Sequence, residues 1–350
     1  MSISAEIFYA NMCKKCNYEF EISYKKDVQV YISEICQQRI ENILYYFMNN
    51  GYQEDAKNLL LGILKNPDMS NGYVNEALVY AWFLEQQIPF QLQCEIDKED
   101  CLKKHSYKAD GMVENIVFDI KKFGIGFSHF KTLRENIQEF FPDTLVTVSG
   151  DLNIETKEIE KNLLSKVPNI VKKLRDNEVH GEYIYEELGI EIRVQKSKHI
   201  ITSSDFNEYK WAEKNQYYFM QDGSQFCIKT PYIIICPLDS KSFLASKKPK
   251  EIYAILRPFC RRIFINLLKM KNYKLKTYDG KAKEDVSVAD AAKKLSAIVF
   301  LDVTKEWGYG KNGMWVFCNP NADNVLPEYK VDILFRQKGA CIENFKYDNY

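Results

Sequence analysis

Glycine, proline and histidine are scarce in this chain, and neither sign of charge is in excess. Its 350 residues include 15 glycines, 10 prolines and 4 histidines. So little glycine and proline excludes collagen-like and linker-dominated chains. The histidines show no HxH or HExxH spacing, which gives no support to a histidine metal site or a catalytic triad. Basic and acidic residues number 48 each, so any nucleic-acid binding must come from a local patch rather than from an overall positive field.

Long hydrophobic runs are also absent. The very apolar stretch 232–236 is far shorter than the ~20 residues that span a bilayer. The first 20 residues lack a basic segment followed by an apolar one, so we expect no signal peptide. Ten cysteines without such a signal indicate reduced thiols in a cytoplasmic protein. No GxxxxGK[ST] run occurs, and ATP-driven chemistry is not expected.

Hydrophobic periodicity predicts helices and then a mixture of helices and strands. Apolar residues at three- and four-residue steps predict helices over about 30–48, 53–64 and 73–87. After them, β-rich runs predict strands at 90–96, 112–120, 144–148, 190–194, 232–236, 298–303 and 315–318, with helices at 130–141, 156–175 and 250–270. This order predicts an α/β protein. We expect an N-terminal helical segment (1–70), an α/β core (71–150) and a C-terminal α+β portion (151–350), which is a second domain or an extension of the core.

Carboxylates and a lysine cluster around one predicted strand. The apolar run 116–118 leads directly into Asp119, Ile120 and Lys121, and Asp110–Gly111 precedes it. Because residues two apart share a face of a strand, Asp119 and Lys121 project together. If the Asp110 strand pairs with the Asp119 strand as a hairpin, the two carboxylates meet at one end of the sheet. Carboxylates suit Mg²⁺, and a nearby ammonium neutralises charge that develops on a phosphate, so this set suits phosphodiester hydrolysis.

The pattern resembles the PD-(D/E)xK nuclease superfamily, whose fold is called restriction-endonuclease-like. The resemblance covers about 73–150 and rests on the helix with Glu76, then Pro89-Phe90, then Lys108-Ala-Asp110-Gly, then Val117-Phe-Asp119-Ile-Lys121. It implies a mixed sheet flanked by helices. It also implies that Asp110, Asp119, Glu76 and the Ile120 carbonyl hold Mg²⁺ or Mn²⁺, and that Lys121 is the catalytic lysine. Ala109 stands where many members have proline.

Alternatives to this site remain open in the sequence. Asp222–Gly223 with Asp239 and Lys241 forms a similar set, but Pro237 interrupts the strand before the acid. Glu182 with Glu191 lies on a good strand without a lysine. A third alternative is that Asp110–Gly111 is an ordinary turn and that Asp119 and Lys121 are a solvated edge.

Two further patterns are ambiguous. Cys13 and Cys16 have the spacing of half a zinc site, yet no convincing pair of partners follows, so ordinary thiols are favoured. Arg257, Arg261 and Arg262 lie beside apolar residues of the helix predicted at 250–270. They would either meet phosphates or cover core surface with their aliphatic stems.

The expected function is therefore metal-dependent hydrolysis of DNA, preferably double-stranded. By analogy with the superfamily, the enzyme would be a restriction or defence endonuclease, and a homodimer is a possible form. The alternative is a non-catalytic module that binds nucleic acid or protein and retains a nuclease-like fold.

Overall fold

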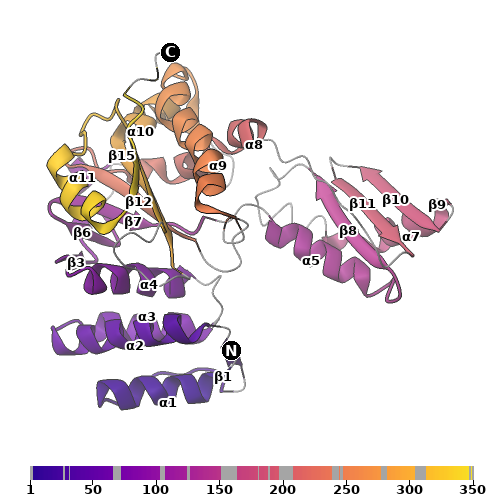
Figure 1. The fold of residues 1–350 in the computed structure, drawn as a ribbon, viewed down its shortest axis with the longest axis horizontal. Coiled ribbons are helices and arrows are strands. Elements are labelled where there is room, and N and C mark those ends of the chain that lie inside the picture. The colour runs from indigo at the N-terminus through magenta and orange to yellow at the C-terminus, as the bar shows by residue number, and fades with distance from the viewer. Residues whose placement is uncertain are drawn as a thin grey trace. The chain divides into compact units, whose positions relative to one another are not determined.

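The chain forms two compact units (Figure 1). One unit comprises 1–123 and 216–350, and the other comprises 124–215. The computed structural model describes residues 3–26, 28–30, 32–65, 72–102, 107–123, 127–150, 164–179, 181–187, 190–196, 208–238, 244, 247–276, 282–303, 313–346 and 348. Within these residues no helix is both long and apolar enough to cross a membrane.

Four helices open the larger unit, and the second and third share a layer between the first and the fourth (Figure 1). They are α1 (Ala5–Cys16), α2 (Glu34–Asn49), α3 (Gln53–Lys65) and α4 (Gly72–Glu85). The predicted helices at 53–64 and 73–87 are confirmed. The helix predicted from residue 30 begins at Glu34 because the Ser33 hydroxyl accepts the Cys36 N–H and caps it.

A mixed sheet forms the centre of the larger unit. Within the described residues its order is β17-β16-β15-β12-β7-β6-β3. The strands are β3 (Gln91–Leu92), β6 (Gly111–Val113), β7 (Ile116–Ile120), β12 (Tyr232–Leu238), β15 (Leu295–Asp302), β16 (Met314–Cys318) and β17 (Cys341–Glu343). β12 runs parallel to both β7 and β15, whereas β6 is antiparallel to β7 and to β3. The α/β class expected from the sequence is thus confirmed.

Alternation along the strands gives the sheet two packed faces. On one face Phe118 and Ile233 belong to a core shared with α1–α4 and with α11 (Glu328–Leu334). On the other face Phe300 contacts Phe123, which packs on Phe259 of α9 (Pro249–Arg261). The strands are therefore buried on both sides, which explains their nearly continuous apolar sequences.

Shorter elements complete the larger unit. They are β1 (Ile3–Ser4), β2 (Gln29–Val30), β4 (Glu95–Ile96), β5 (Tyr107–Lys108), β13 (Lys274–Lys276), β14 (Ala282–Ser287) and α10 (Val288–Lys294). The single strand predicted at 90–96 is divided into β3 and β4, since Gln93 adopts a left-handed φ of 51° between them. The helix predicted to 270 continues beyond Arg261 as π and 3₁₀ turns to Lys269, and Pro258 inside it has no N–H to donate.

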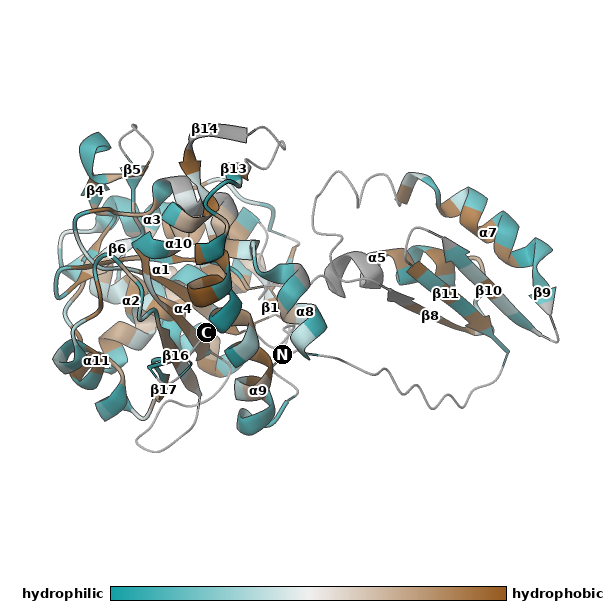
Figure 2. Cartoon of the chain, turned by 90° about the horizontal axis from the view of Figure 1, so that it is seen from above, coloured by the Kyte–Doolittle hydropathy of each residue, from teal (hydrophilic) through white to brown (hydrophobic). Residues whose placement is uncertain are grey.

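The smaller unit is a two-layer α+β structure. It contains α5 (Phe127–Gln138), β8 (Leu145–Gly150), α7 (Val167–Asp176), β9 (Glu178–Val179), β10 (Glu182–Glu187), β11 (Ile190–Gln195) and α8 (Glu208–Asn215). Its antiparallel sheet has the order β8-β11-β10-β9, and the apolar faces of α5 and α7 pack with its buried residues. Figure 2 shows the hydrophobic residues of α7 on one side of the helix.

These units divide the chain differently from the boundaries expected at 70 and 150. The helix predicted at 130–141 and the strand predicted at 144–148 are α5 and β8, which belong to the smaller unit and not to the predicted 71–150 core. The parallel neighbour of β7 is instead β12, more than 100 residues later. Strands from 151–350 therefore extend the sheet that contains β7. The first part of the helix predicted at 156–175 lies outside the described residues.

Candidate metal-dependent active site

A tight hairpin brings Asp110 and Asp119 together. Glu114 and Asn115 form its two-residue turn with φ values of 49° and 60°, the left-handed pair that favours twisted hairpins. Gly111 pairs with Phe118, so the same register continued by one residue places Asp110 opposite Asp119. The Asp110 N–H donates to Asp119 Oδ1 at 3.3 Å, and the Ile120 N–H donates to Asp110 Oδ2 at 2.6 Å. The two carboxylates therefore lie side by side at one end of the hairpin.

Gly111 allows this close packing. A Cβ atom there would lie 2.5 Å from the Gln91 carbonyl oxygen and 2.5 Å from Phe118 Cζ. Any other residue would push away either β3 or the Phe118 ring. The glycine after Asp110 is thus required for the approach of neighbouring groups, in addition to any preference for a turn.

Asp119 is held in a buried network of donors. The side chain is 1% exposed, and the Tyr232 hydroxyl donates to its Oδ2 at 2.6 Å. Lys121 Nζ lies 3.4 Å from the same oxygen. Burial and the nearby Asp119 carboxylate raise the pKa of the Tyr107 hydroxyl. The Asp110 N–H donates to the other oxygen, Oδ1, so both oxygens of Asp119 already accept hydrogen bonds from the protein.

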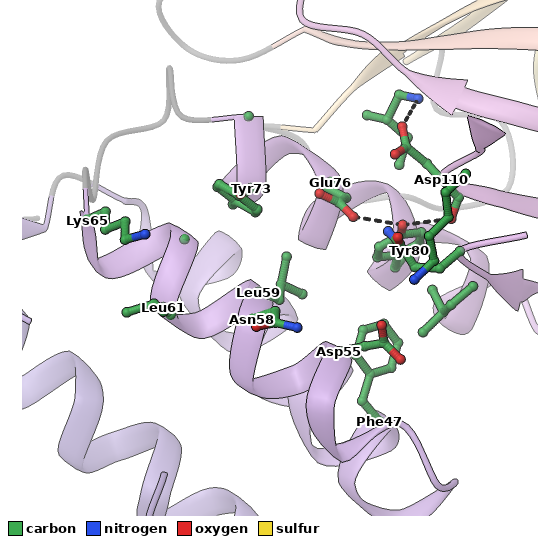
Figure 3. A pocket seen from close by; sticks show the side chains of 16 residues that line it. Phe47, Asp55, Asn58, Leu59, Leu61, Lys65, Tyr73, Glu76, Tyr80 and Asp110 are labelled. Atoms are coloured by element: carbon green, nitrogen blue, oxygen red, sulfur yellow. Dashed lines mark hydrogen bonds between the residues drawn. The ribbon is translucent and has the colours of Figure 1, made fainter. Parts of the chain in front are cut away.

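Glu76 reaches the site from α4 through Tyr80. The Tyr80 hydroxyl lies 2.9 Å from Glu76 Oε1 and 2.9 Å from the Asp110 carbonyl oxygen (Figure 3). Tyr80 is fixed by stacking on Phe90, with ring centroids 5.6 Å apart. Because Tyr80 is one helical turn after Glu76, both face the same side of α4.

The electrostatics of the site show an excess of negative charge. Burial and then the charges of Asp119 and Glu76 raise the pKa of Asp110 to about 7, against the opposing effects of the Ile120 N–H and Lys121. Burial likewise raises the pKa of Glu76, although its hydrogen bond with Tyr80 lowers it. Asp55 and Asp119 add to the increase for Glu76. A cation placed among these groups would stabilise their ionised forms.

A cavity of ≈ 650 Å³ opens beside Glu76 and Asp110 (Figure 3). Ile120 also lines it, whereas Asp119 and Lys121 are not among its lining residues. The remaining lining residues come from α2, α3, α4 and the segments around β3 and β5: Phe47, Asp55, Asn58, Leu59, Leu61, Gly62, Lys65, Gly72, Tyr73, Tyr80, Leu92, Gln93 and Lys108.

Glu76 and Asp110 have the chemistry that a magnesium ion requires. Mg²⁺ commonly uses one or two carboxylates together with waters and substrate phosphates, and both of these acids line the cavity. In the part of the chain that the structure describes, no group of three or more His, Cys, Asp or Glu side chains is already arranged to hold a metal ion. Asp119 in particular would have to give up a donor, such as Lys121, before it could join.

Sequence reasoning missed the tyrosines of this site. Tyr80 could have been found, since it follows Glu76 at helical spacing. Tyr232 could not, because only the pairing of β12 with β7 brings it to Asp119. Tyr107 lies in a two-residue strand with no periodicity to mark it.

Replacing Tyr232 by phenylalanine tests the buried network. The change removes one donor from a fully buried carboxylate oxygen, so we expect a loss of about 1–3 kcal/mol in the free energy of unfolding. Urea titration would measure it, with Tyr329→Phe as the control because Tyr329 is 61% exposed. Equal stability of the two variants would show that the hydroxyl does not support Asp119.

Of the two alternative acid sets, the structure describes the one in the smaller unit and not the one around Asp222. Glu182 and Glu191 form ion pairs with Arg193 on the sheet of the smaller unit. Asp239 and Lys241 lie outside the described residues, and the side chain of Asp222 is likewise not described.

The arginines of α9 bind the C-terminal segment. Arg257 Nε lies 2.8 Å from Glu343 Oε2, and its Nη2 lies 2.8 Å from Asp348 Oδ1. Arg261 Nε lies 3.3 Å from Asp348 Oδ2. The Arg257 guanidinium also lies over the Phe345 ring. These contacts favour the structural alternative for Arg257 and Arg261 over phosphate binding.

Cys13 and Cys16 are free thiols near the end of α1. Burial raises the pKa of Cys16 to about 11, which disfavours the thiolate that zinc requires. We expect elemental analysis of the purified protein to find no stoichiometric zinc. One tightly held zinc per chain, lost in a Cys13→Ser variant, would contradict this expectation.

Comparison with known proteins leaves the site to be judged from its own geometry. The chain matches no protein-family model, and no curated protein and no solved structure shows significant similarity to it.

Proposed function

We propose that the protein is a metal-dependent nuclease that hydrolyses phosphodiester bonds in DNA. The observation that carries the proposal is the contact between Asp110 and Asp119 across the β6–β7 hairpin, with Lys121 beside Asp119 and Glu76 joined to Asp110 through Tyr80. An excess of carboxylates beside one ammonium and a cavity is the composition that a metal-assisted phosphoryl site needs.

The order of elements supports a restriction-endonuclease-like core. α4 carries Glu76, β3 and the β6–β7 hairpin follow it, and β12 then lies parallel to β7. In this proposal the smaller unit, 124–215, is an insertion between β7 and β12. The proposed core then includes β12, which comes from the portion (151–350) that the sequence left open as a second domain or an extension of the core.

Glu76 and Asp110 would hold the divalent ion, with the Ile120 carbonyl and Asp119 as further ligands. When bound, Mg²⁺ polarises a phosphoryl oxygen and lowers the pKa of a coordinated water. Lys121 supplies positive charge next to Asp119, where it would stabilise charge that develops on the phosphate. Tyr80 orients Glu76, and the Ile120 N–H orients Asp110.

A cleavage assay tests the proposal. Purified protein should cut DNA in the presence of Mg²⁺ or Mn²⁺ and should stop when EDTA removes the ion. A Glu76→Gln variant should cut more slowly at low Mg²⁺ and recover partly at high Mg²⁺, because it loses a ligand charge. The absence of cleavage on single-stranded and duplex DNA and RNA of varied sequence, with either ion, would contradict the proposal.

One observation favours a non-catalytic module instead. Asp119 is 1% exposed, and both of its oxygens already accept hydrogen bonds from the protein, which suits a structural acid. Such a module would bind nucleic acid or protein without cutting, and its binding would not respond to EDTA. The same assay, read together with an equilibrium binding measurement, separates the two functions.

A further inference from the structure

The cavity beside Glu76 and Asp110 extends well beyond the two carboxylates. Figure 3 shows it reaching from Asp110 past α4 to Lys65 at the end of α3. Its ≈ 650 Å³ falls in the range of about 300–1,000 Å³ that holds one small organic group. An ion with its waters would fill only part of this space. The rest is available to a portion of the substrate.

One wall of the cavity can recognise hydrogen-bond donors. Asp55 and Asn58 are three residues apart on α3, so they share a face of the helix, and both line the cavity. Figure 3 shows the two side chains below Glu76 and Tyr80. The Asp55 carboxylate accepts hydrogen bonds, and the Asn58 amide both accepts and donates them. The edge of a nucleobase that bears an amino group offers the complementary pattern.

Other walls of the cavity are flat and apolar. The Tyr73 ring lies directly over the backbone of Gly62, since a Cβ atom on Gly62 would be 2.4 Å from Tyr73 Cγ. Leu59 and Phe47 add apolar surface. Aromatic and aliphatic surface of this kind stacks against the faces of bases with little regard to sequence.

Two lysines complete the lining. Lys65 ends α3, and Lys108 is two residues before Asp110. A strand whose base enters the cavity would bring its backbone phosphates to these ammonium groups and to the carboxylates that hold the ion. The cavity thus combines acceptors for a base edge, surface for its face and cations for its phosphates.

We infer that this cavity holds a single unpaired nucleotide, so that the substrate is single-stranded DNA or DNA with an extruded base. The inference rests on the proposed function and names its substrate class. A paired base in a duplex already uses its Watson–Crick edge and is stacked on both faces, so it reaches a recessed site only by leaving the helix. Cytosine, adenine and guanine present an exocyclic amine to Asp55, whereas thymine presents only its N3–H between two carbonyl groups.

Binding of deoxynucleoside monophosphates tests the cavity without any cleavage. Calorimetric titration of the full chain in Mg²⁺ with dCMP, dAMP, dGMP and dTMP, which contain no phosphodiester bond to cut, should show dTMP to be the weakest ligand. Asp55→Asn should weaken binding of the amino-bearing nucleotides at least tenfold, because the amide replaces an acceptor by a donor. Gly62→Ala should weaken all four, because its methyl group displaces the Tyr73 ring. Glu54→Gln is the control, since Glu54 is exposed on α3 and does not line the cavity.

Cleavage rates test the substrate class. With Mg²⁺, the protein should cut a labelled single strand at least tenfold faster than the fully paired duplex of the same sequence. It should cut a duplex that contains one unpaired nucleotide faster by the same factor. Circular dichroism of each variant would show whether it is folded. If Gly62→Ala does not fold, Asp55→Asn provides the decisive comparison.

The two measurements separate this inference from the nuclease proposal. If nucleotides bind, Asp55→Asn weakens that binding, and no substrate is cut, the result supports a nucleotide site in the cavity and counts against the nuclease proposal. Cleavage of the paired duplex at the same rate as the single strand overturns the inference and leaves the nuclease standing. Failure to bind any monophosphate, or binding that neither Asp55→Asn nor Gly62→Ala alters, also overturns it.

Discussion

Asp110→Asn is expected to stabilise the folded chain at alkaline pH while it abolishes metal-dependent cleavage. The pKa of Asp110 is raised to about 7 by burial and by the charges of Asp119 and Glu76. An unfolded chain ionises this group near pH 4. Ionisation of Asp110 therefore lowers the free energy of unfolding of the wild type. This loss should be absent below about pH 4 and should grow as the pH rises through 7. Asparagine removes the charge and retains an oxygen for the Ile120 N–H.

Urea titrations at pH 5.5 and 8.5 would measure this effect. At pH 8.5 the variant should gain about 1–3 kcal/mol over wild type, since each pKa unit corresponds to about 1.4 kcal/mol and solvent reduces the repulsion. The gain should shrink at pH 5.5. Asp97→Asn is the control because Asp97 is exposed and makes no capping hydrogen bond. A gain that does not change with pH would show that Asp110 does not carry the repulsion described here.

The second large effect is expected at Lys121. The Lys121→Met variant keeps an unbranched side chain about as long as the aliphatic stem of lysine but removes the ammonium that lies 3.4 Å from Asp119. We expect cleavage to slow by roughly 10²–10³-fold, the loss seen when one stabilising donor is removed from a charged transition state. DNA affinity should change by less than about tenfold, because most affinity comes from phosphate contacts spread over the surface.

Lys122→Met is the matched control for this experiment. Lys122 is the next residue and is exposed, so the control removes the same charge one position further along. Its cleavage rate should remain within a few-fold of wild type. Unchanged cleavage in Lys121→Met would exclude Lys121 from the chemistry. Equal losses of binding and cleavage would instead indicate a binding role or misfolding.

The local part of this site could be predicted from the sequence. Asp110, Asp119 and Lys121 lie within 12 residues, and the two-residue turn at Glu114–Asn115 sets the register that brings the acids together. Glu76 could also be found, because it is an acidic residue within a mostly apolar helical run and the strands follow this helix directly. Local hairpin geometry and helical spacing were sufficient for these residues.

The non-local part could not be predicted. The smaller unit separates β7 from β12 along the chain. The prediction placed consecutive elements in one core and therefore assigned α5 and β8 to it. β12 is buried on both faces, and its uniformly apolar sequence does not show which strand it joins. Tyr232 was missed for the same reason. Where an inserted unit begins and ends depends on which strands pair in the sheet, and the amino-acid composition does not show that pairing.

Anomalous diffraction from crystals soaked in Mn²⁺ tests the central claim most directly. We expect one peak in the cavity, about 2.1–2.3 Å from carboxylate oxygens of both Glu76 and Asp110, as is usual for a hard cation with oxygen ligands. The peak should be absent in crystals of Asp110→Asn. No peak at Glu76 and Asp110 in the wild type, at a Mn²⁺ concentration that supports cleavage, would contradict the account.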